Sequence, residues 1–178
     1  MNNPKISIIC ALSENRVIGQ GDRIPWHIKA DLIHFKEKTL HHTIIMGRNT
    51  FDSLLGYYQR NGRPMPERNN IIVTRDKKYL KSNVGVSINQ LIDTLVVNSL
   101  DEALQKAKEI EKEEIFISGG EQIFKQTIHL AEKLYLTIVE GVFEGDKYFP
   151  DYSIFKKVIS KEEGEEKGKR FTFVELEK

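Results

Sequence analysis

The chain passes from an apolar strand into a helix at Ile45-Met46-Gly47-Arg48-Asn49-Thr50-Phe51. Residues 43–46 form a short apolar run, which is typical of a strand buried on both faces of a parallel sheet. Residues 49–55 after Gly47 predict a short helix. The same strand, glycine loop and helix recur over 114–129, around Ser118-Gly119-Gly120. This alternation indicates an α/β fold built around a mostly parallel sheet.

The other regular segments fit this architecture. Further strands are predicted at residues 6–12, 70–74, 94–97 and 133–139, and loops at 13–24 and 56–67. Helices are predicted at 30–39 and from residue 99 to 108 or beyond, and the second opens with the capping box Ser99-Leu100-Asp101-Glu102.

Two regions are less regular. Within 75–98, residues 84–86 are strand-like and residues 88–92 are compatible with a helical turn. Near the C-terminus, alternating residues at 155–160 and 170–176 predict an antiparallel pair of strands. The charged run 161–169 between them predicts a solvated hairpin loop.

The composition is that of an ordinary globular protein. The chain has 178 residues, of which 39% are hydrophobic and 30% charged, which suits one domain over residues 1–178. The net charge of +1 gives no support to bulk electrostatic capture of nucleic acid or of an anionic membrane. The single cysteine, Cys10, cannot form an intramolecular disulfide, and no signal peptide or membrane-length apolar stretch is visible. We therefore expect a cytoplasmic protein that binds neither nucleic acid nor membrane.

Asp31 is a lone carboxylate among apolar residues, just behind the pair Pro25-Trp26. In a helix over 30–39 it shares one face with Leu32 and Phe35, because residues three and four apart stack on an α-helix. A carboxylate in an apolar setting is costly unless something pairs with it, and a ligand with an amidine-like N–C–N edge would do so. The alternative is that Asp31 simply starts the helix, since Asp is favoured near helix N-termini.

Three strand ends carry residues suited to phosphate groups: Gly47 with Arg48 and Thr50, the pair Gly119-Gly120, and Thr74-Arg75. Glycine lets the backbone approach a ligand, and the helix that follows presents free N–H groups and the positive end of its dipole. The hydroxyl and guanidinium of Thr74-Arg75 suit an additional phosphate, such as the ribose 2′-phosphate of NADP. The alternative at each place is an ordinary turn or a solvated arginine, and no segment matches the G-x-G-x-x-G fingerprint.

No metal site and no nucleophilic triad are predicted. The adjacent histidines His41-His42 would point apart on a helix or a strand, so joint ligation of a metal ion is not expected. No serine lies in a G-x-S-x-G elbow, and the chain has no P-loop.

In combination, the motifs resemble those of dihydrofolate reductases, in family order and over nearly the whole chain. The residues that carry the resemblance are Ala11-Leu12, Val17-Ile18-Gly19, Ile24-Pro25-Trp26, Asp31-Leu32, Phe35-Lys36, Ile45-Met46-Gly47-Arg48, Thr50-Phe51, Pro64, Pro66, Arg68-Asn69, Ser118-Gly119-Gly120, Ile123-Phe124, Tyr135-Leu136-Thr137, Glu144-Gly145-Asp146 and Phe149-Pro150. No single motif is decisive, but their ordered combination is highly specific. An aspartate at position 31 is similar to the bacterial branch of the family.

The resemblance implies both a fold and a reaction. The expected fold is a single-domain, three-layer α/β sandwich, whose mostly parallel eight-stranded sheet has an antiparallel C-terminal edge strand and about four flanking helices. The expected reaction is hydride transfer from NADPH to C6 of 7,8-dihydrofolate, giving 5,6,7,8-tetrahydrofolate for one-carbon metabolism and thymidylate synthesis. The implied ligands are NADPH, dihydrofolate and antifolate inhibitors, and the implied state is a monomer.

The resemblance also assigns roles to residues. Asp31 would hydrogen-bond the pterin amino group and ring N3, with Thr137 behind it, and Trp26 would hold an ordered water; with Ile24, these are the expected catalytic residues. The expected substrate-binding residues are Ile9, Cys10, Asp31, Leu32, Phe35, Leu54, Arg68, Ser118 and Thr137. Among them, Arg68 would pair with the α-carboxylate of the glutamate tail, a charge-assisted contact that suits arginine.

The cofactor would bind at the glycine loops, with segment 13–24 closing over its nicotinamide ring. The expected cofactor-binding residues are Ala11, Ile18, Gly19, Gly47, Arg48, Asn49, Thr50, Thr74, Arg75, Ser118, Gly119, Gly120, Glu121, Gln122 and Ile123. The resemblance further implies that the peptide bond between Gly119 and Gly120 is cis.

Three features depart from the family pattern. Ser118 stands where a larger apolar residue is usual beside the pterin, so we expect weaker binding of diaminopyrimidine antifolates such as trimethoprim. Residues 55–62 form an insertion beside the substrate entrance, which bears on the contacts of Arg68. Residues 75–98 are also extended, on the adenosine side of the cofactor.

Two other functions stay open at the level of sequence. A pyrimidine reductase of the riboflavin pathway has a similar fold, although Asp31 with Trp26 and Arg68 argues against it. A non-catalytic NADP-binding or regulatory module is the second alternative. Such a module would be expected to lack Asp31 or the loop glycine, and both are present.

Overall fold

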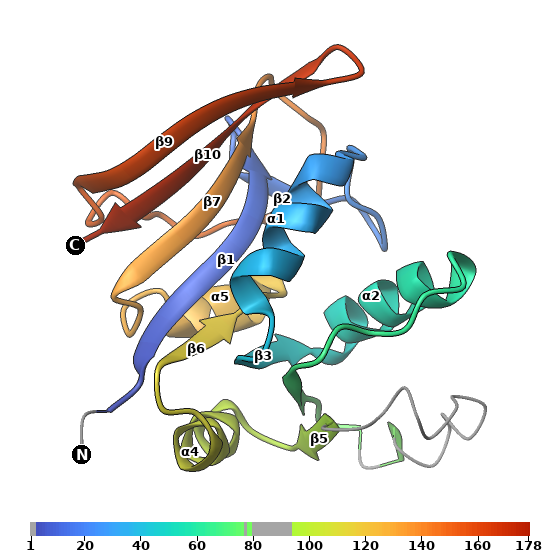
Figure 1. The fold of residues 1–178 in the computed structure, drawn as a ribbon, viewed down its shortest axis with the longest axis vertical. Coiled ribbons are helices and arrows are strands. Elements are labelled where there is room, and N and C mark those ends of the chain that lie inside the picture. Colours follow the sequence, from blue (N-terminus) through green and yellow to red (C-terminus); the bar gives the residue numbers. More distant parts are fainter. Residues whose placement is uncertain (1–2, 77, 80–93) are drawn as a thin grey trace.

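The computed structural model describes residues 3–76, 78–79 and 94–178. Its strands are β1 (Lys5–Ser13), β2 (Val17–Gly19), β3 (Thr43–Gly47), β4 (Asn69–Val73), β5 (Thr94–Val97), β6 (Glu114–Ile117), β7 (Lys133–Val139), β8 (Lys147–Tyr148), β9 (Lys157–Glu166) and β10 (Lys169–Glu177). The described helices are α1 (Lys29–Thr39), α2 (Arg48–Arg60), α4 (Leu100–Ile110) and α5 (Glu121–Thr127). Figure 1 shows β5 near one end of the molecule and the β9–β10 hairpin at the other.

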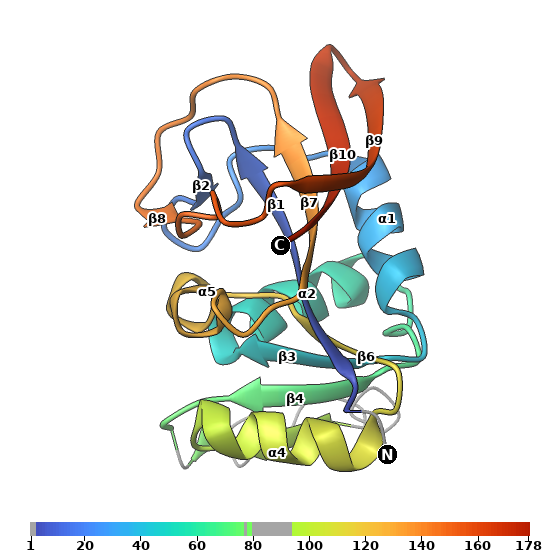
Figure 2. The same ribbon diagram turned by 90° about the vertical axis from the view of Figure 1, so that its left-hand side faces the viewer.

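The main sheet has eight strands in the order β5-β4-β3-β6-β1-β7-β10-β9. The six strands from β5 to β7 in this order are parallel to one another, whereas β10 is antiparallel to β7 and β9 is antiparallel to β10. Helices lie on both faces, and Figure 2 shows α1 and α5 on opposite sides of the sheet. The predicted three-layer α/β architecture with an antiparallel C-terminal edge is therefore confirmed.

Consecutive residues of the parallel strands point into two separate cores. Side chains alternate across a strand, so a sheet covered on both faces needs apolar residues at successive positions. In four strands, one of two neighbouring residues belongs to the first core and the other to the second. These neighbours are Ile8 and Ile9 in β1, Ile44 and Ile45 in β3, Ile71 and Ile72 in β4, and Ile115 and Phe116 in β6. This arrangement explains why short isoleucine runs predicted the central strands correctly.

Segment 13–24 is not entirely a loop, which corrects the prediction. Strand β2 lies within it and pairs with β8, with Val17 opposite Tyr148. The turn before β2 is fixed by Ser13, whose Oγ accepts a hydrogen bond from the Val17 N–H (3.0 Å). A three-residue strand whose partner lies far along the chain leaves no periodicity in the sequence.

Helix α2 is longer than predicted, because it continues through Gly56 to Arg60. Its buried residues Phe51, Leu55 and Tyr58 follow a helical spacing, so the apolar face does not stop at the glycine. The Arg60 guanidinium covers that glycine, since a Cβ on Gly56 would lie 3.0 Å from Arg60 Nη1. The predicted loop at 56–67 therefore starts later, and much of the insertion at 55–62 is helical.

The charged run 161–169 is mostly strand, although a hairpin loop was predicted there. The predicted antiparallel pair is present as β9 and β10, and the turn between them consists only of Lys167-Gly168, with φ values of +51° and +76°. Two-residue turns with positive φ at both positions match the twist of hairpin strands. Strand β9 is an edge of the sheet, where charged side chains are favoured because they discourage pairing with another chain.

The region before α4 is described only in part. The predicted strand at 94–97 is present as β5, and the capping box is confirmed, since Ser99 Oγ accepts a hydrogen bond from the Glu102 N–H (3.2 Å). The elements predicted at 84–86 and 88–92 lie outside the described residues. Within the described ranges, no helix has the length and apolar character needed to cross a membrane.

Glu111 joins the end of α4 to the start of β3 through its buried carboxylate. Oε2 accepts a hydrogen bond from the Thr43 N–H (2.8 Å), and Oε1 accepts from the N–H groups of Lys112 (2.9 Å) and Glu113 (3.0 Å). Burial alone would raise the pKa of Glu111, but the hydrogen bonds from Glu113, Thr43 and Lys112 outweigh it and hold this pKa below its ordinary value. The ionised carboxylate thus stabilises the strand that leads to Gly47.

Replacing Glu111 by glutamine is expected to lower the free energy of unfolding at pH 7 by about 1–3 kcal/mol, because a buried N–H group loses its acceptor. A carboxyl whose pKa is lowered by folding stabilises the protein above its unfolded pKa, and this contribution is lost as the pH falls through the folded pKa. The difference between the two proteins should therefore shrink below about pH 4. Urea unfolding between pH 7 and about pH 3 measures it, with exposed Glu109→Gln as the control; equal loss in both variants would refute the role of Glu111.

Candidate active site

Two glycine loops meet at the carboxyl ends of β3 and β6. The Gly47 N–H donates to the carbonyl of Gly119 (2.7 Å), and the peptide bond between Gly119 and Gly120 is cis, as expected. Gly119 has φ +120°, a conformation that residues with a side chain rarely adopt. A Cβ on Gly119 would also lie 3.4 Å from Thr50 Oγ1. This close approach places the starts of α2 and α5 next to each other.

A cavity of about 810 Å³ opens at these loops. Its walls are the starts of α2, α4 and α5 and the end of β4. Ten of the predicted cofactor-binding residues line it: Gly47, Arg48, Asn49, Thr50, Thr74, Arg75, Gly120, Glu121, Gln122 and Ile123. Gly47 directly precedes α2 and provides no side-chain cap, so the first N–H groups of the helix are available to an anion.

The cavity is large enough for a phosphorylated cofactor. Ligand sites of this kind commonly enclose about 300–1,000 Å³. Its walls carry the cations Arg48, Arg75 and Lys147 and the acids Asp76, Asp101 and Glu121. Two of the cations are paired, since Arg48 Nη1 lies 3.1 Å from Asp76 Oδ2 and Lys147 Nζ lies 3.4 Å from Asp146 Oδ1, which leaves the Arg75 guanidinium for a phosphate. The sequence interpretation missed Asp76 and Lys147. Asp76 directly follows the predicted pair Thr74-Arg75 and could have been found, whereas Lys147 comes from a distant segment.

A second group of predicted residues gathers around Asp31, in the first turn of α1. Strands β1 and β7 are neighbours, with Cys10 opposite Leu136 and Ala11 opposite Thr137. Desolvation raises the pKa of the half-buried Asp31 carboxyl, and a hydrogen bond with the Thr137 side chain opposes this shift. The Asp31 charge and burial together raise the pKa of the Cys10 thiol, with burial the larger cause. Asp31, Cys10 and Thr137 therefore form one desolvated polar cluster.

Trp26 belongs to a core cluster against which Ala11 and Ala30, the sequence neighbours of Cys10 and Asp31, are packed. Its ring is buried and packs with Ile28 and Phe171, and its Nε1 donor has no hydrogen-bond partner among the described residues. A buried N–H group without a protein partner is usually satisfied by water or by a ligand. Ile24, in contrast, is 55% exposed, so the structure does not bring it into the buried wall around Asp31.

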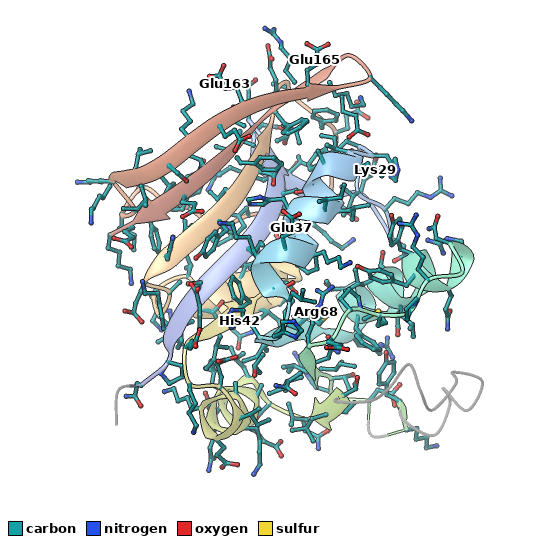
Figure 3. The ribbon with its side chains drawn as sticks, viewed as in Figure 1. Lys29, Glu37, His42, Arg68, Glu163 and Glu165 are labelled. Atoms are coloured by element: carbon teal, nitrogen blue, oxygen red, sulfur yellow. The ribbon has the colours of Figure 1, made fainter. Side chains whose placement is uncertain are left out.

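Arg68 forms the far end of this site. Its side chain is 3% exposed, and its guanidinium carbon lies 5.0 Å from the centroid of the Phe35 ring. Nη2 donates to the Tyr58 hydroxyl (3.5 Å), while Nε and Nη1 have no partner in the part of the chain that the structure describes. Figure 3 shows Arg68 and Lys29 near opposite ends of α1. A buried guanidinium with two unsatisfied donors is suited to an anionic ligand group.

Apolar residues connect Asp31 with Arg68. Leu32 is half-buried, and Phe35 and Leu54 pack against the core cluster that contains Ile9. Tyr58 was missed at the level of sequence because it falls in the predicted loop, but its helical spacing from Phe51 could have revealed it. The structure thus brings the predicted substrate residues of α1, α2 and β1 to one wall.

Ser118 lies directly before the cis peptide, at the end of β6. Its Oγ is buried and has no hydrogen-bond partner within the described ranges. With Ala11, Ile18, Gly19 and Gly119, it belongs to the predicted cofactor residues that do not line the 810 Å³ cavity. Of these five residues, Ala11 lies in β1, Ile18 and Gly19 lie in β2, and Ser118 and Gly119 lie in the loop after β6.

Segment 13–24 is tied to segment 140–150. The Asp146 N–H donates to the Gly19 carbonyl (3.1 Å), and Asp146 Oδ1 accepts from the Gly21 N–H (2.9 Å). Lys147 Nζ also donates to the Gly21 carbonyl. The conformation of the predicted closing segment therefore depends on a second, distant segment.

The chain is similar to known proteins over almost its full length. The family model described as dihydrofolate reductase matches residues 5–178. A dihydrofolate reductase of Buchnera aphidicola subsp. Baizongia pistaciae is 41% identical over 179 residues, covering 97% of this chain and 98% of the relative. The dihydrofolate reductase of Bacillus subtilis is 37% identical over 160 residues, covering 89% and 84%.

A solved structure agrees with these matches. It is dihydrofolate reductase from Enterococcus faecalis complexed with NADP(H) and RAB-propyl, which has a TM-score of 0.76 and 29% identity and covers 97% of this chain and 95% of that chain. The sequence matches and the structural match therefore point to the same family, and both cover almost the whole chain. The protein belongs to the dihydrofolate reductase family.

Proposed function

We propose that the protein reduces 7,8-dihydrofolate to 5,6,7,8-tetrahydrofolate with NADPH, and thereby supports one-carbon metabolism and thymidylate synthesis. The observation that carries the proposal is the desolvated Asp31 carboxyl group, which lies beside Thr137 and has no cationic partner among the residues that the structure describes. We also propose that the chain acts as one cytoplasmic domain over residues 1–178, in monomeric form.

NADPH would supply the hydride, and the chain would supply position and electrostatics. Arg48, Thr50, Thr74 and Arg75 would hold the phosphates, with Asn49, Glu121, Gln122 and Ile123 around the adjoining sugar and base. Gly47, Gly119 and Gly120 allow the backbone to approach the pyrophosphate. Ala11, Ile18 and Gly19 would border the nicotinamide ring.

The substrate would lie along the wall between Asp31 and Arg68. Asp31 would accept hydrogen bonds from the pterin amino group and ring N3, which is a bidentate, charge-assisted contact. Leu32, Phe35 and Leu54 would cover the ring system, and the two unpaired donors of Arg68 would bind the α-carboxylate of the tail. Desolvation strengthens each of these polar contacts.

Proton transfer to N5 of the pterin completes the reaction. We expect that Asp31 does not reach N5 itself, and we propose that a water beside Trp26 is the immediate donor. Asp31 would raise the basicity of N5 through the ring and orient that water. The unsatisfied Nε1 donor of Trp26 provides a hydrogen-bonding site for it.

The decisive experiment follows the fall in NADPH absorbance after dihydrofolate is added. Turnover that requires both compounds is the expected result. Binding of NADPH without turnover would refute the proposal and would favour the pyrimidine reductase or the non-catalytic module. The pyrimidine reductase is then tested directly with a ribosylamino-pyrimidine substrate in the same assay.

Ser118 is expected to weaken antifolate binding. A small side chain with an unpaired hydroxyl leaves the wall beside the pterin less apolar than a branched side chain would. Ser118→Ile should therefore tighten trimethoprim binding by about tenfold, the value of one additional apolar contact. Inhibition constants for the wild type, Ser118→Ile and the control Ser118→Ala test this; unchanged or weaker inhibition of the isoleucine variant would contradict it.

A further inference from the structure

The residue that precedes helix α1 does not cap the first N–H groups of the helix. The residue before it, Ile28, has extended backbone angles and no side-chain hydrogen bond to the helix. The first two N–H groups donate instead to one carboxylate: Lys29 to Glu166 Oε1 and Ala30 to Glu166 Oε2, each at 3.0 Å. Glu166 lies 137 residues from Lys29 in the chain, at the end of β9.

The hairpin that carries Glu166 is held against the start of α1. The turn Lys167-Gly168 directly follows Glu166, and Phe171 on the returning strand packs in one buried cluster with Trp26 and Ile28. The hairpin is also closely packed internally, because a Cβ on Gly164 would lie 2.6 Å from Phe171 Cζ. The packing of Phe171 against Trp26 and Ile28 therefore holds the hairpin, and with it Glu166, beside the start of α1.

Both N–H groups lie immediately before Asp31. The first turn of a helix carries partial positive charge, and any carboxylate within reach competes for it. With Glu166 in place, the Lys29 and Ala30 donors are occupied, and those bonds hold the pKa of Glu166 below its ordinary value. Lys167 and His27 are the other charged or titratable groups that act on Glu166.

We infer that Glu166 is a positioning residue for Asp31: it occupies the helix N-terminus, so that the Asp31 carboxylate remains turned towards Thr137 and the substrate. This inference rests on the proposed function. Without Glu166, the Lys29 and Ala30 N–H groups would be free to bind the Asp31 carboxylate. That carboxylate would then be stabilised in its charged form and turned towards the helix backbone.

The test compares Glu166→Gln with Glu165→Gln. Successive residues of a strand point to opposite sides, and the side chain of Glu165 forms no hydrogen bond or ion pair with any described residue. Figure 3 shows the Glu165 side chain on the hairpin, pointing away from Lys29. The two variants therefore lose the same charge from the same hairpin, and only one loses the contact with α1.

For Glu166→Gln we expect the KM of dihydrofolate to rise about fivefold and the pH profile of kcat/KM to move to lower pH by about half a unit or more. For Glu165→Gln, both quantities should equal those of the wild type. Equal profiles and KM values in the two variants would overturn the inference, as would a Glu166→Gln variant that loses only thermal stability. A wild type without turnover would instead refute the proposed function, so the two failures are distinguishable.

Discussion

Asp31→Asn is expected to lower kcat/KM for dihydrofolate by on the order of 100-fold or more at neutral pH, the scale of a positioned acid–base group. An amide has the size of the carboxylate but cannot accept two hydrogen bonds from an amidine-like edge, and it carries no charge to raise the basicity of the pterin. Thr137 would still contact position 31, so the geometry of the first turn should persist. The measurement is steady-state turnover from pH 5 to pH 9.

The same variant should be at least as stable as the wild type at pH 7. Desolvation raises the pKa of Asp31 in the folded protein, so the folded state binds more protons than the unfolded state between the two pKa values. The free energy of unfolding therefore falls as the pH rises through this window, and Asn removes that loss. Urea unfolding at pH 7 measures the difference in the free energy of unfolding between the two proteins.

Near-normal turnover of Asp31→Asn across neutral pH would refute the role assigned to Asp31. If the variant is as stable as the wild type, a loss of turnover cannot be caused by misfolding.

Among the predicted variants, Gly145→Ala should cause the second largest loss of turnover. A Cβ at this position would overlap Val17 Cγ1 and would lie 2.7 Å from the Gly19 carbonyl oxygen, closer than such contacts occur in proteins. The segment around β2 would have to move away from residues 145–147, which would break the hydrogen bond between the Asp146 N–H and Gly19. A misplacement of about 1 Å can reduce a rate by about 100-fold when reacting groups must be aligned.

We therefore expect kcat of Gly145→Ala to fall by on the order of 100-fold, with a higher KM for NADPH. Stopped-flow hydride transfer and NADPH titration separate the two effects. Val142→Ala is the matched control, because Val142 lies in the same segment and is 80% exposed. If the kcat of Gly145→Ala is within twofold of the control, turnover does not depend on the contact between segment 13–24 and residues 145–147.

The centre of the fold could be predicted because its signals are local. Isoleucine pairs such as Ile44-Ile45 mark a strand covered on both faces, and Ser99 with Glu102 marks a helix start. The glycine loops at 47 and 119–120 could be placed for the same reason, since they directly follow predicted strands. Each of these patterns lies within a few residues of the feature that it predicts.

The bounds of several elements and the contacts between distant segments could not be predicted, because their determinants lie far apart in sequence or contradict local propensity. Gly56 suggests the end of a helix, but Arg60 covers it and α2 continues. Glu162, Glu163 and Glu165 suggest a loop, but they are exposed residues of an edge strand. The contacts of Glu166 with α1 and of Asp146 with Gly21 join segments more than 120 residues apart.

The position of β1 determines the order in which the molecule can be assembled. β1 is the first strand of the chain, yet its two neighbours are β6 and β7, at residues 114–117 and 133–139. A growing chain must therefore keep an apolar strand without a partner until most of its length has been synthesised, a state that invites aggregation. Closing such long loops is slow. The wall that carries Cys10 and Ala11 is the first to be translated and among the last to be completed.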